Sequence, residues 1–378
     1  MVEWKKLGEV SGRNKGIPIT AGQMSELASK DGNVRVFAAG STIADIDESL
    51  LPKNCAHKLP SIIVKSRGYI DFEFYEKPFT HKNEMWSYSF DNKQEGKFIY
   101  YFLTTQTDFF RNKAKANSVK LPQLCVADTD NYLIPIPSLE EQTRIVGILD
   151  TFTSAIDNLK EQIAQRRKQY EYYRDQLLDL EGKEGVEMKY LLDVLAQPVT
   201  DGPHETPSFY EDGIPFISAD AIVDNKINFS RKRGYISEEY DLLCQKKYKP
   251  QLNDIYLVKS GSTTGKVAIV RTDERFNIWS PLAAIRVNQR NHPYFVYYML
   301  QTKKVQDQVK LKSSQGSQPN LSMRVLEKFI IPVPPLSEQQ RIVSILDTFE
   351  ASIQNLEAQL SQREKQYEYY RNKLLTFE

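Results

Sequence analysis

The sequence predicts an α+β protein built from two mixed helix–strand modules, each followed by one long helix. The first observation is an internal repeat, because a segment of 48 residues occurs twice at a constant offset of 197, with 30 of the 48 positions identical. The second is a helical stripe of apolar residues in both copies. The third is the strand-like composition of the segments that precede the two copies of the repeat. A repeat of this length indicates a duplicated architecture, so it is considered before the individual elements.

The repeated segments, residues 134–181 and 331–378, carry their own helix signals. Prolines such as Pro135 and Pro332 open each copy, and proline disfavours helical geometry in the residue before it. Apolar residues then alternate four-three spacing through five heptads, which is typical of a helix that supercoils with a partner. At about 1.5 Å per residue each helix would be roughly 60 Å long. The predicted seam includes Ile145, Leu149, Phe152, Ile156 and Leu159, and in the second copy Ile342, Leu346, Phe349, Ile353 and Leu356.

Two interpretations of these stripes stay open. Matching stripes favour two helices that pack on each other, whereas a single long core helix in a bundle would show the same spacing. Arg166 and Arg363 interrupt the stripes at matching places, where they would set the register or pair across the seam. Tyrosines of both copies are expected to pack the coiled coil, namely Tyr170, Tyr173, Tyr367 and Tyr370.

The segments before the repeats, module 1 (residues 1–133) and module 2 (residues 186–330), are predicted to be divergent copies of each other. Short matches support this, since Lys65-Ser66 resembles Lys259-Ser260 and Trp86-Ser87 resembles Trp279-Ser280. Both tryptophans are predicted to lie in the module cores. Composition predicts strands over 60–65, 69–75, 255–259 and 266–271, and one helix per module over 97–103 and 294–304.

Composition bounds the class of protein. The 378 residues suffice for two or three domains, and 40% hydrophobic and 26% charged content is ordinary for a folded protein. Lys and Arg outnumber Asp and Glu by 18 to 16 in module 1 and by 20 to 16 in residues 186–333. Mildly basic modules are compatible with nucleic acid, although ordinary solvated surfaces give the same small excess. Three isolated cysteines, no signal-peptide core and no run of ~20 apolar residues favour a cytoplasmic protein.

The sequence offers no catalytic centre. The segment Gly261–Lys266 looks like a phosphate loop, but it has three residues between its glycines instead of four, and Val267 follows the lysine. No Asn-Pro-Pro-Tyr-like tetrad for amino-methyl transfer is present. The four histidines show no metal spacing. We therefore assign no catalytic and no metal-binding residue.

Several motifs resemble one known family. Both helix starts read Ile-Pro-x-Pro-x-Leu-x-Glu-Gln-x-Arg-Ile, and module 2 adds Thr200–Pro207, Gly213–Ile217 and Gly316–Ser322. Together they resemble the specificity (S) subunit of type I restriction–modification systems, over essentially the whole chain. Module 1 departs from the pattern. Residues 116–124 resemble the glutamine-containing segment Gly316–Ser322 only weakly, and no His-x-Thr-Pro stands near the start of the module.

The resemblance implies an architecture and a function. Two target recognition domains, residues 1–133 and 186–330, would each read one half of a bipartite double-stranded DNA sequence. Spacer helices, residues 134–185 and 331–378, would form an antiparallel coiled coil with pseudo-twofold symmetry that holds the domains apart. The partners would be methyltransferase (M) subunits, two by symmetry, and endonuclease/translocase (R) subunits. S-adenosylmethionine, ATP and Mg²⁺ would belong to those partners, with no cofactor in this chain.

Polar loops after predicted strands are the candidate DNA contacts, because Lys and Arg reach phosphates and guanine edges while hydroxyls and amides bond to either. A plain β-turn with solvated charges is the alternative for each loop. In module 1 the candidates are Lys65, Ser66 and Arg67. In module 2 they are His204, Thr206, Arg231, Lys232, Arg233, Lys259, Ser260, Ser262, Thr263, Thr264, Lys266, Ser317, Gln318 and Asn320.

Two other functions remain possible on the sequence alone. One is a DNA-modifying enzyme with an unrecognised catalytic site, which the missing motifs disfavour. The other is a protein-only coiled-coil scaffold, which DNA binding would exclude. The favoured hypothesis is a DNA-recognition subunit that is not itself an enzyme.

Overall fold

The computed structural model describes residues 2–118, 120–314 and 318–377, in two units. Unit 1 comprises residues 1–161 with 357–378, and unit 2 comprises residues 162–356. Each unit therefore holds one module together with parts of both long helices, α5 (Leu139–Leu178) and α10 (Leu336–Leu374). Among the described residues, none of the helices has the length and apolarity to span a membrane.

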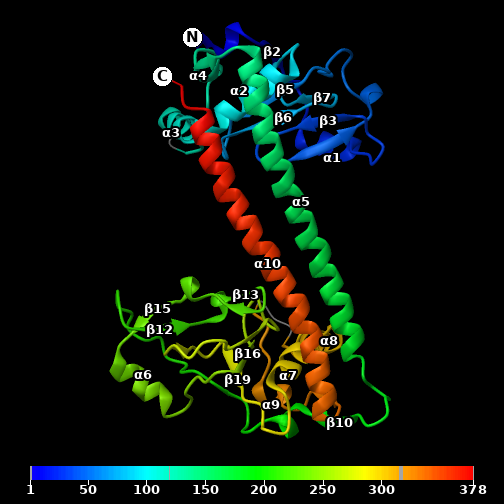
Figure 1. Cartoon of the computed structure of the whole chain (residues 1–378), viewed down its shortest axis with the longest axis vertical. Coiled ribbons are helices and arrows are strands. Elements are labelled where there is room, and N and C mark those ends of the chain that lie inside the picture. Colours follow the sequence, from blue (N-terminus) through cyan, green and yellow to red (C-terminus); the bar gives the residue numbers. More distant parts are fainter. Residues whose placement is uncertain (1, 119, 315–317, 378) are drawn as a thin grey trace. The chain divides into compact units, whose positions relative to one another are not determined.

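The described residues of unit 1 form two sheets of three or more strands and one two-stranded ribbon (Figure 1). The larger is antiparallel, in the order β2 (Gly12–Lys15), β8 (Trp86–Ser89), β5 (Ser61–Lys65), β6 (Asp71–Tyr75). The smaller has the order β4 (Ile43–Ile46), β3 (Val34–Phe37), β7 (Phe79–His81), with β3 and β7 parallel. A ribbon pairs β1 (Glu3–Lys6) with β9 (Leu133–Ile136). The helices are α1 (Ala21–Leu27), α2 (Lys93–Thr105), α3 (Thr107–Asn117) and α4 (Val126–Asp130).

Unit 2 repeats this plan. Its antiparallel sheet has the order β11 (Thr200–Asp201), β19 (Leu282–Ile285), β16 (Ile255–Val258), β17 (Val267–Ile269). The second sheet has the order β15 (Gly234–Ile236), β12 (Ile214–Ile217), β18 (Asn277–Ile278), with β12 and β18 parallel. A ribbon pairs β10 (Glu187–Tyr190) with β20 (Ile330–Val333), and β13 (Ile222–Val223) with β14 (Lys226–Ile227) forms a hairpin. The helices are α6 (Glu238–Gln245), α7 (Pro293–Leu300), α8 (Lys303–Lys312) and α9 (Met323–Leu326).

These elements confirm the four predicted strands and correct the expectation of one helix per module. The predicted helix over 294–304 is two helices, α7 and α8. The break falls at Thr302, whose side chain caps α8 by accepting a hydrogen bond from the Val305 amide. A threonine at a cap satisfies a free amide of the first turn, which favours a new helix start over continuation.

Backbone hydrogen bonds show which residues of module 1 and module 2 are structurally equivalent, and they contradict two of the predicted matches. The Leu124 amide donates to Ser66 O, and the Leu321 amide donates to Lys259 O. Ser66 is therefore equivalent to Lys259, one position away from the match of Lys65-Ser66 with Lys259-Ser260. A shift of one residue in a strand moves each side chain to the opposite face. The two Lys-Ser pairs are therefore not structurally equivalent, although their sequences are identical.

The match of Trp86 with Trp279 was also wrong. The Trp279 amide donates to Ile217 O, just as the Lys82 amide donates to Phe37 O, so Trp279 takes the place of Lys82. Trp86 lies in the core of module 1, where its indole N–H donates to Thr129 Oγ1 at 2.9 Å. Trp279 is only half-buried. The prediction of a core role therefore holds for Trp86 alone.

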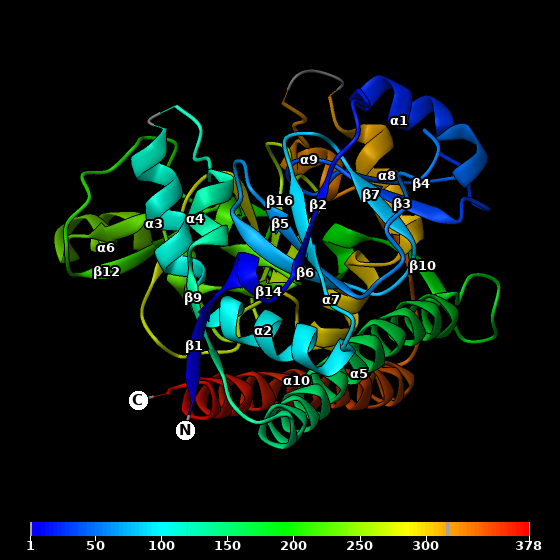
Figure 2. The same ribbon diagram turned by 90° about the horizontal axis from the view of Figure 1, so that it is seen from above.

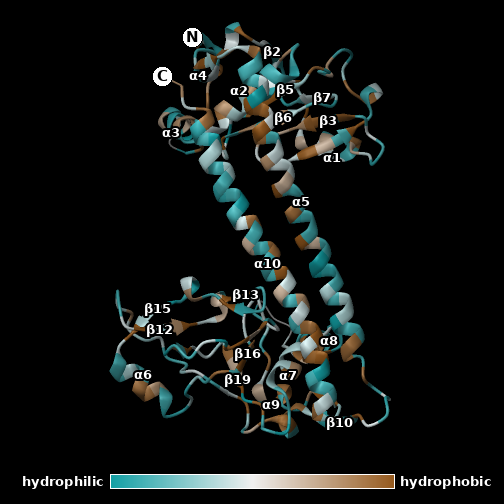
Figure 3. Ribbon diagram, viewed as in Figure 1, coloured by the Kyte–Doolittle hydropathy of each residue, from teal (hydrophilic) through white to brown (hydrophobic). Residues whose placement is uncertain are grey.

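The long helices begin where the sequence predicts. The Glu141 amide lies 3.3 Å from Ser138 Oγ, which caps the start of α5. Gln142 Nε2 donates to Pro137 O, and Gln339 Nε2 donates to Pro334 O, each at 2.9 Å. Along both helices apolar and polar residues alternate (Figure 3). At the start of each helix a glutamine side chain, Gln142 or Gln339, therefore bonds to the carbonyl of a preceding proline.

The two helices pack on each other in both units, and they run antiparallel. In unit 1 Phe152, in the first half of α5, stacks on Tyr370, near the end of α10. In unit 2 Tyr173, near the end of α5, stacks on Phe349, in the first half of α10. The single-core-helix alternative is thereby excluded.

The stripe does more than form a helix–helix seam. Ile145 and Leu149 belong to the core of module 1, which includes residues of β5, β8 and α2. Ile342 and Leu346 belong to the core of module 2 in the same way. Tyr170 also contacts module 2, with its ring 6.4 Å from that of Tyr298. The first turns of each helix therefore anchor a module, and Figure 2 shows α2 lying beside the start of α5.

Candidate nucleic-acid interface

Four segments of module 2 meet at the ends of the β11–β19–β16–β17 sheet. We call residues 201–206, 259–266, 279–281 and 318–321 the loop cluster. Backbone hydrogen bonds join them: the Ser280 amide donates to Pro203 O at 3.1 Å, and the Lys259 amide donates to Pro281 O at 2.8 Å. The Gly261 amide donates to Pro319 O at 3.0 Å. The structure thus brings together loops that lie more than a hundred residues apart in the sequence.

Glycines permit this close approach. A Cβ atom on Gly202 would lie 1.9 Å from Ile278 O, so any other residue would push the 201–206 segment away from β18. Gly261 and Gly265 both have φ of +100°, a conformation that side chains disfavour. Thr264 Oγ1 donates to Gly261 O at 2.7 Å and so closes the turn between them. The loop that resembles a phosphate loop is therefore a turn closed by its own threonine and bonded to Pro319.

The predicted module 2 contacts differ in accessibility. Those that are exposed are His204, Thr206, Ser262, Lys266, Gln318 and Asn320. Ser260, Thr263 and Thr264 are half-buried. Thr264 is used within the turn, which removes it from the free hydroxyls. Ser317 lies outside the described residues.

Lys259, one of the predicted DNA contacts, is mostly buried and forms an ion pair within the protein. Its side chain is 12% exposed and its Nζ lies 3.2 Å from Asp201 Oδ2. Lys247, at the end of the α6 segment, also pairs with Asp201, and His204 Nε2 lies 3.2 Å from the same carboxylate. Burial raises the pKa of Asp201, but the two lysines outweigh it, so the pKa lies below its ordinary value. The carboxylate is ionised at neutral pH.

Sequence reasoning missed Asp201 and Lys247. Asp201 stands inside the quoted Thr-Asp-Gly-Pro-His motif, but only its histidine and threonine were selected. Lys247 stands in a run of charged residues that carries no motif. The pairing of Lys247 with Asp201 joins positions 46 residues apart. The signal that the sequence offers is an aspartate directly before a glycine inside this motif.

The basic run Arg231–Arg233 reaches the loop cluster through Trp279. The Arg233 guanidinium lies 5.2 Å from the centre of the Trp279 ring, a cation–π contact, and 3.4 Å from Asp220. Lys232 Nζ lies 4.5 Å from the Tyr235 ring centre. Arg231 is exposed. The Trp279 indole N–H is buried and has no hydrogen-bond partner among the described residues.

Module 1 places its three candidates less favourably. Lys65 Nζ pairs with Glu73 at 2.7 Å, and the Ser66 hydroxyl, 1% exposed, donates to Glu84 O. Ser66 follows strand β5 with its side chain turned inward, so it is poorly placed for the predicted DNA contact. Arg67 is partly exposed, which leaves it as the best placed of the three candidates to reach a ligand.

The interior of module 1 holds a buried histidine. His81 Nε2 lies 3.1 Å from Ser87 Oγ, and its ring centre lies 5.8 Å from that of His57. Burial lowers the pKa of His81 to about 4, and it lowers the pKa of His57 as well. Both rings are neutral at pH 7, so they contribute no positive charge to a DNA surface.

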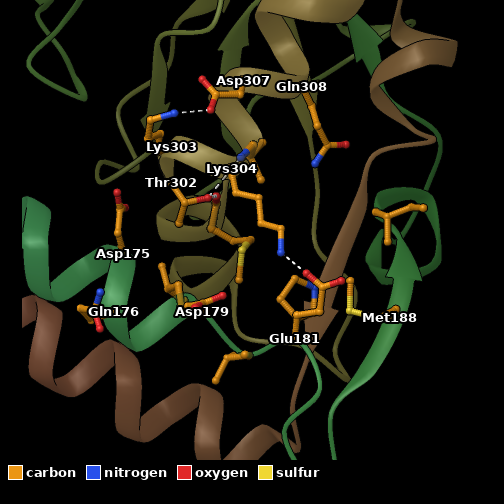
Figure 4. A pocket seen from close by; sticks show the side chains of 16 residues that line it. Asp175, Gln176, Asp179, Glu181, Met188, Thr302, Lys303, Lys304, Asp307 and Gln308 are labelled. Atoms are coloured by element: carbon orange, nitrogen blue, oxygen red, sulfur yellow. Dashed lines mark hydrogen bonds and ion pairs between the residues drawn. The ribbon is translucent and has the colours of Figure 1, made fainter.

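Two further features bear on chemistry. Nowhere in the described residues do three or more His, Cys, Asp or Glu side chains gather as a metal site requires. A pocket of about 400 Å³ lies in unit 2 between the end of α5 and α8, where Lys304 pairs with Glu181 and Lys303 with Asp307 (Figure 4). None of the predicted DNA contacts is among the residues that line it.

The fold thus duplicates one module with cation-bearing loops and joins each copy to a long helix. The family model for the type I restriction modification DNA specificity domain matches residues 1–166 and 202–364. The chain therefore belongs to this family. Its role is that of the specificity subunit of a type I restriction–modification system, which recognises DNA and is not the catalytic subunit.

Individual relatives agree with this family assignment. The chain is 33% identical over 343 residues to the specificity subunit of the type I restriction enzymes EcoR124I/EcoR124II of Escherichia coli, covering 85% of this chain and 81% of that protein. It is 28% identical over 402 residues to a putative type I specificity subunit of Haemophilus influenzae, covering 100% and 96%. The crystal structure of the S subunit from M. genitalium has the same fold, with a TM-score of 0.63 at 16% identity, covering 100% of this chain and 97% of that one.

Proposed function

We propose that the chain recognises a bipartite double-stranded DNA target, with residues 1–133 reading one half and residues 186–330 reading the other. The spacer helices, residues 134–185 and 331–378, connect the two readers. The duplication of the whole sheet plan carries this proposal, since two copies of one recognition surface serve two half-sites. Half-site spacing mirrors the geometry of paired recognition elements in other DNA-binding proteins.

Within module 2 the DNA contacts are the exposed members of the loop cluster with Arg231–Arg233. Lys266 and Arg231 are exposed cations and suit phosphates, which bind Lys and Arg without regard to sequence. Gln318 and Asn320 carry amides, which pair with base edges. Arg67 has the corresponding role in module 1.

The partners follow from the symmetry of the helix starts. Arg144 pairs with Glu141 on α5, and Arg341 pairs with Glu338 on α10, at closely similar distances. The two copies thus present equivalent exposed surfaces, which suit two copies of a methyltransferase subunit. The endonuclease/translocase subunits join the same complex. S-adenosylmethionine, ATP and Mg²⁺ belong to those partners, and the complex acts in the cytoplasm.

Two measurements separate this function from its alternatives. Binding of target DNA by the methyltransferase complex should depend on this chain and weaken steeply with salt, since charge-neutralising contacts release counterions. Salt-independent binding, or binding without this chain, would leave only the scaffold hypothesis. Transfer of a labelled methyl group to DNA by the purified chain alone would instead support the enzyme hypothesis.

The proposed contacts of module 2 are tested by removing one exposed cation of the loop cluster and one of the basic run, Lys266→Ala with Arg231→Ala. We expect the slope of log K against log salt to fall by up to about 2, because each phosphate contact contributes about 0.9. The matched control, Lys168→Ala with Lys183→Ala, removes two exposed cations elsewhere in unit 2. An equal effect of the control would show that total charge, and not the loop cluster, determines binding.

A further inference from the structure

Three segments of module 2 converge on one buried carboxylate. Asp201 ends β11 and its side chain is 1% exposed. Lys259 follows β16, Lys247 follows α6, and His204 lies three residues beyond Asp201. Their exposed fractions rise outward, at 12% for Lys259, 48% for Lys247 and 70% for His204. The group therefore runs from the interior to the surface of the loop cluster.

The charges within this group do not balance. A buried carboxylate is costly unless it is paired, and one lysine would suffice to neutralise it. Asp201 has two, so the group keeps an excess of one positive charge even when His204 is neutral. Lys247 Nζ also donates to Gly202 O at 3.1 Å, which restrains it further. The two contacts to Oδ2 are ion pairs without hydrogen-bond alignment, so this oxygen acts mainly as a point charge.

We propose that Asp201 is a positioning residue that holds Lys247 and Lys259, with His204 beside them, as a preformed site for a DNA backbone phosphate. This rests on the proposed function and deepens it. Lysine is a compact point charge that binds phosphate without demanding a planar partner, whereas the planar groups of Arg, Asn and Gln match base edges with two parallel hydrogen bonds. A lysine held in place before binding loses less side-chain entropy when the phosphate arrives.

Module 1 does not build this site. The Asn83 amide donates to Ile17 O as the Ser280 amide donates to Pro203 O, which makes Lys15 the counterpart of Asp201. The glycine between them is retained, since a Cβ on Gly16 would lie 2.3 Å from Lys82 O. Ser66 is the counterpart of Lys259. With lysine in place of the carboxylate and serine in place of the lysine, the anchor is absent, so the site distinguishes the second half-site from the first.

The decisive test is Asp201→Asn in the complex with methyltransferase subunits, with target-DNA affinity measured at several salt concentrations. Charge counting alone predicts tighter binding, because a negative charge near DNA is removed. We expect the opposite: binding at least about tenfold weaker and a salt slope lower by about 1, since a phosphate contact is lost. The control Glu239→Gln removes an exposed carboxylate from α6 and should leave binding unchanged or slightly tighter.

A second variant covers the case in which Asp201→Asn fails to fold. Lys247→Gln alters a half-exposed side chain and should lower the salt slope by about 1, with Lys247→Arg restoring it. Unchanged slopes for Lys247→Gln, or tighter binding by folded Asp201→Asn, would overturn the proposal while leaving the proposed function intact. Failure of the unaltered complex to bind DNA would instead remove the proposed function.

Discussion

Phe152 of α5 stacks on Tyr370 of α10, with ring centres 5.3 Å apart and planes inclined at 26°. The same contact occurs a second time with the helices exchanged: Phe349 of α10 stacks on Tyr173 of α5 at 5.5 Å and 27°. Each residue of one pair lies 197 positions from its counterpart, which is the offset of the sequence repeat. An exchange of this kind requires antiparallel helices in each unit, so the internal repeat extends to single side-chain contacts.

The two stacks should contribute equally to stability. A double-mutant cycle with Phe152→Ala and Tyr370→Ala should give a coupling of about 0.5–1.5 kcal/mol in the free energy of unfolding, as for other aromatic pairs. The cycle with Phe349→Ala and Tyr173→Ala is the matched control and should give the same value. Urea denaturation of all variants measures both. Coupling in one pair and none in the other would contradict a symmetric seam.

A second repeated contact fastens each module to its helix. Tyr101 Oη donates to Asp150 Oδ1, and Tyr298 Oη donates to Asp347 Oδ1, both at 2.6 Å. Tyr101→Phe and Tyr298→Phe should each lower the free energy of unfolding by about 1.5–3 kcal/mol, the usual contribution of a hydrogen bond to a charged group. Denaturant midpoints check this. A neutral result for either variant would show that the bond in that unit is replaced by water.

Sequence reasoning found these helices but not their double role. The four-three spacing through Phe152 and Phe349 predicted a seam, which the stacks confirm. It could not show that Ile145 and Ile342 lie in module cores, since a core-facing and a partner-facing stripe have the same period. Asp150 and Asp347 were not selected, because a hydrogen bond to a tyrosine 49 residues away leaves no local pattern.

The exposure of the candidate DNA contacts was predicted in part. His204, Lys266 and Arg231 are exposed as expected, because loops after strands lie on the surface. Ser66 and Lys259 were not, because which way a side chain points at the end of a strand depends on register. The predicted match of Lys65-Ser66 with Lys259-Ser260 was wrong by one residue, because a Lys-Ser pair occurs in both modules. The backbone hydrogen bonds of Ser66 and Lys259 show the correct alignment.

The buried histidine of module 1 should make stability depend on pH. The pKa of His81 is about 4 in the folded protein, below its ordinary value of 6.5. A depressed pKa means that the unfolded chain binds the proton first, so stability is full above pH 6.5 and is lost as the pH falls toward 4. At pH 5 the loss should be about 2 kcal/mol. Urea midpoints at pH 7 and pH 5 measure it.

Replacing that histidine provides the control. His81→Gln should reduce the difference between the pH 7 and pH 5 midpoints, whatever its effect on stability at pH 7. His57, whose pKa is lowered by burial in the same direction, accounts for part of what remains. A variant with the full pH dependence of the unaltered protein would place the titrating group elsewhere.

Glycine substitutions should separate the loop cluster from the helix. Gly202→Ala should be strongly destabilising, because its Cβ would lie 1.9 Å from a backbone oxygen that cannot move without β18. Gly147→Ala, on α5, meets nothing within 4 Å and should stabilise the protein by about 0.5–1 kcal/mol through helix propensity. Thermal melting of both variants tests this. A folded, fully stable Gly202→Ala protein would show that the 201–206 segment is free to shift.

The most direct test of two independent readers is to exchange one of them. Residues 186–330 are replaced by the corresponding module of another specificity subunit, and methylated adenines are mapped across the genome with the native and the exchanged chain. The account predicts that one half of the recognised sequence changes while the other half stays the same. A change in both halves, or in neither, would contradict it.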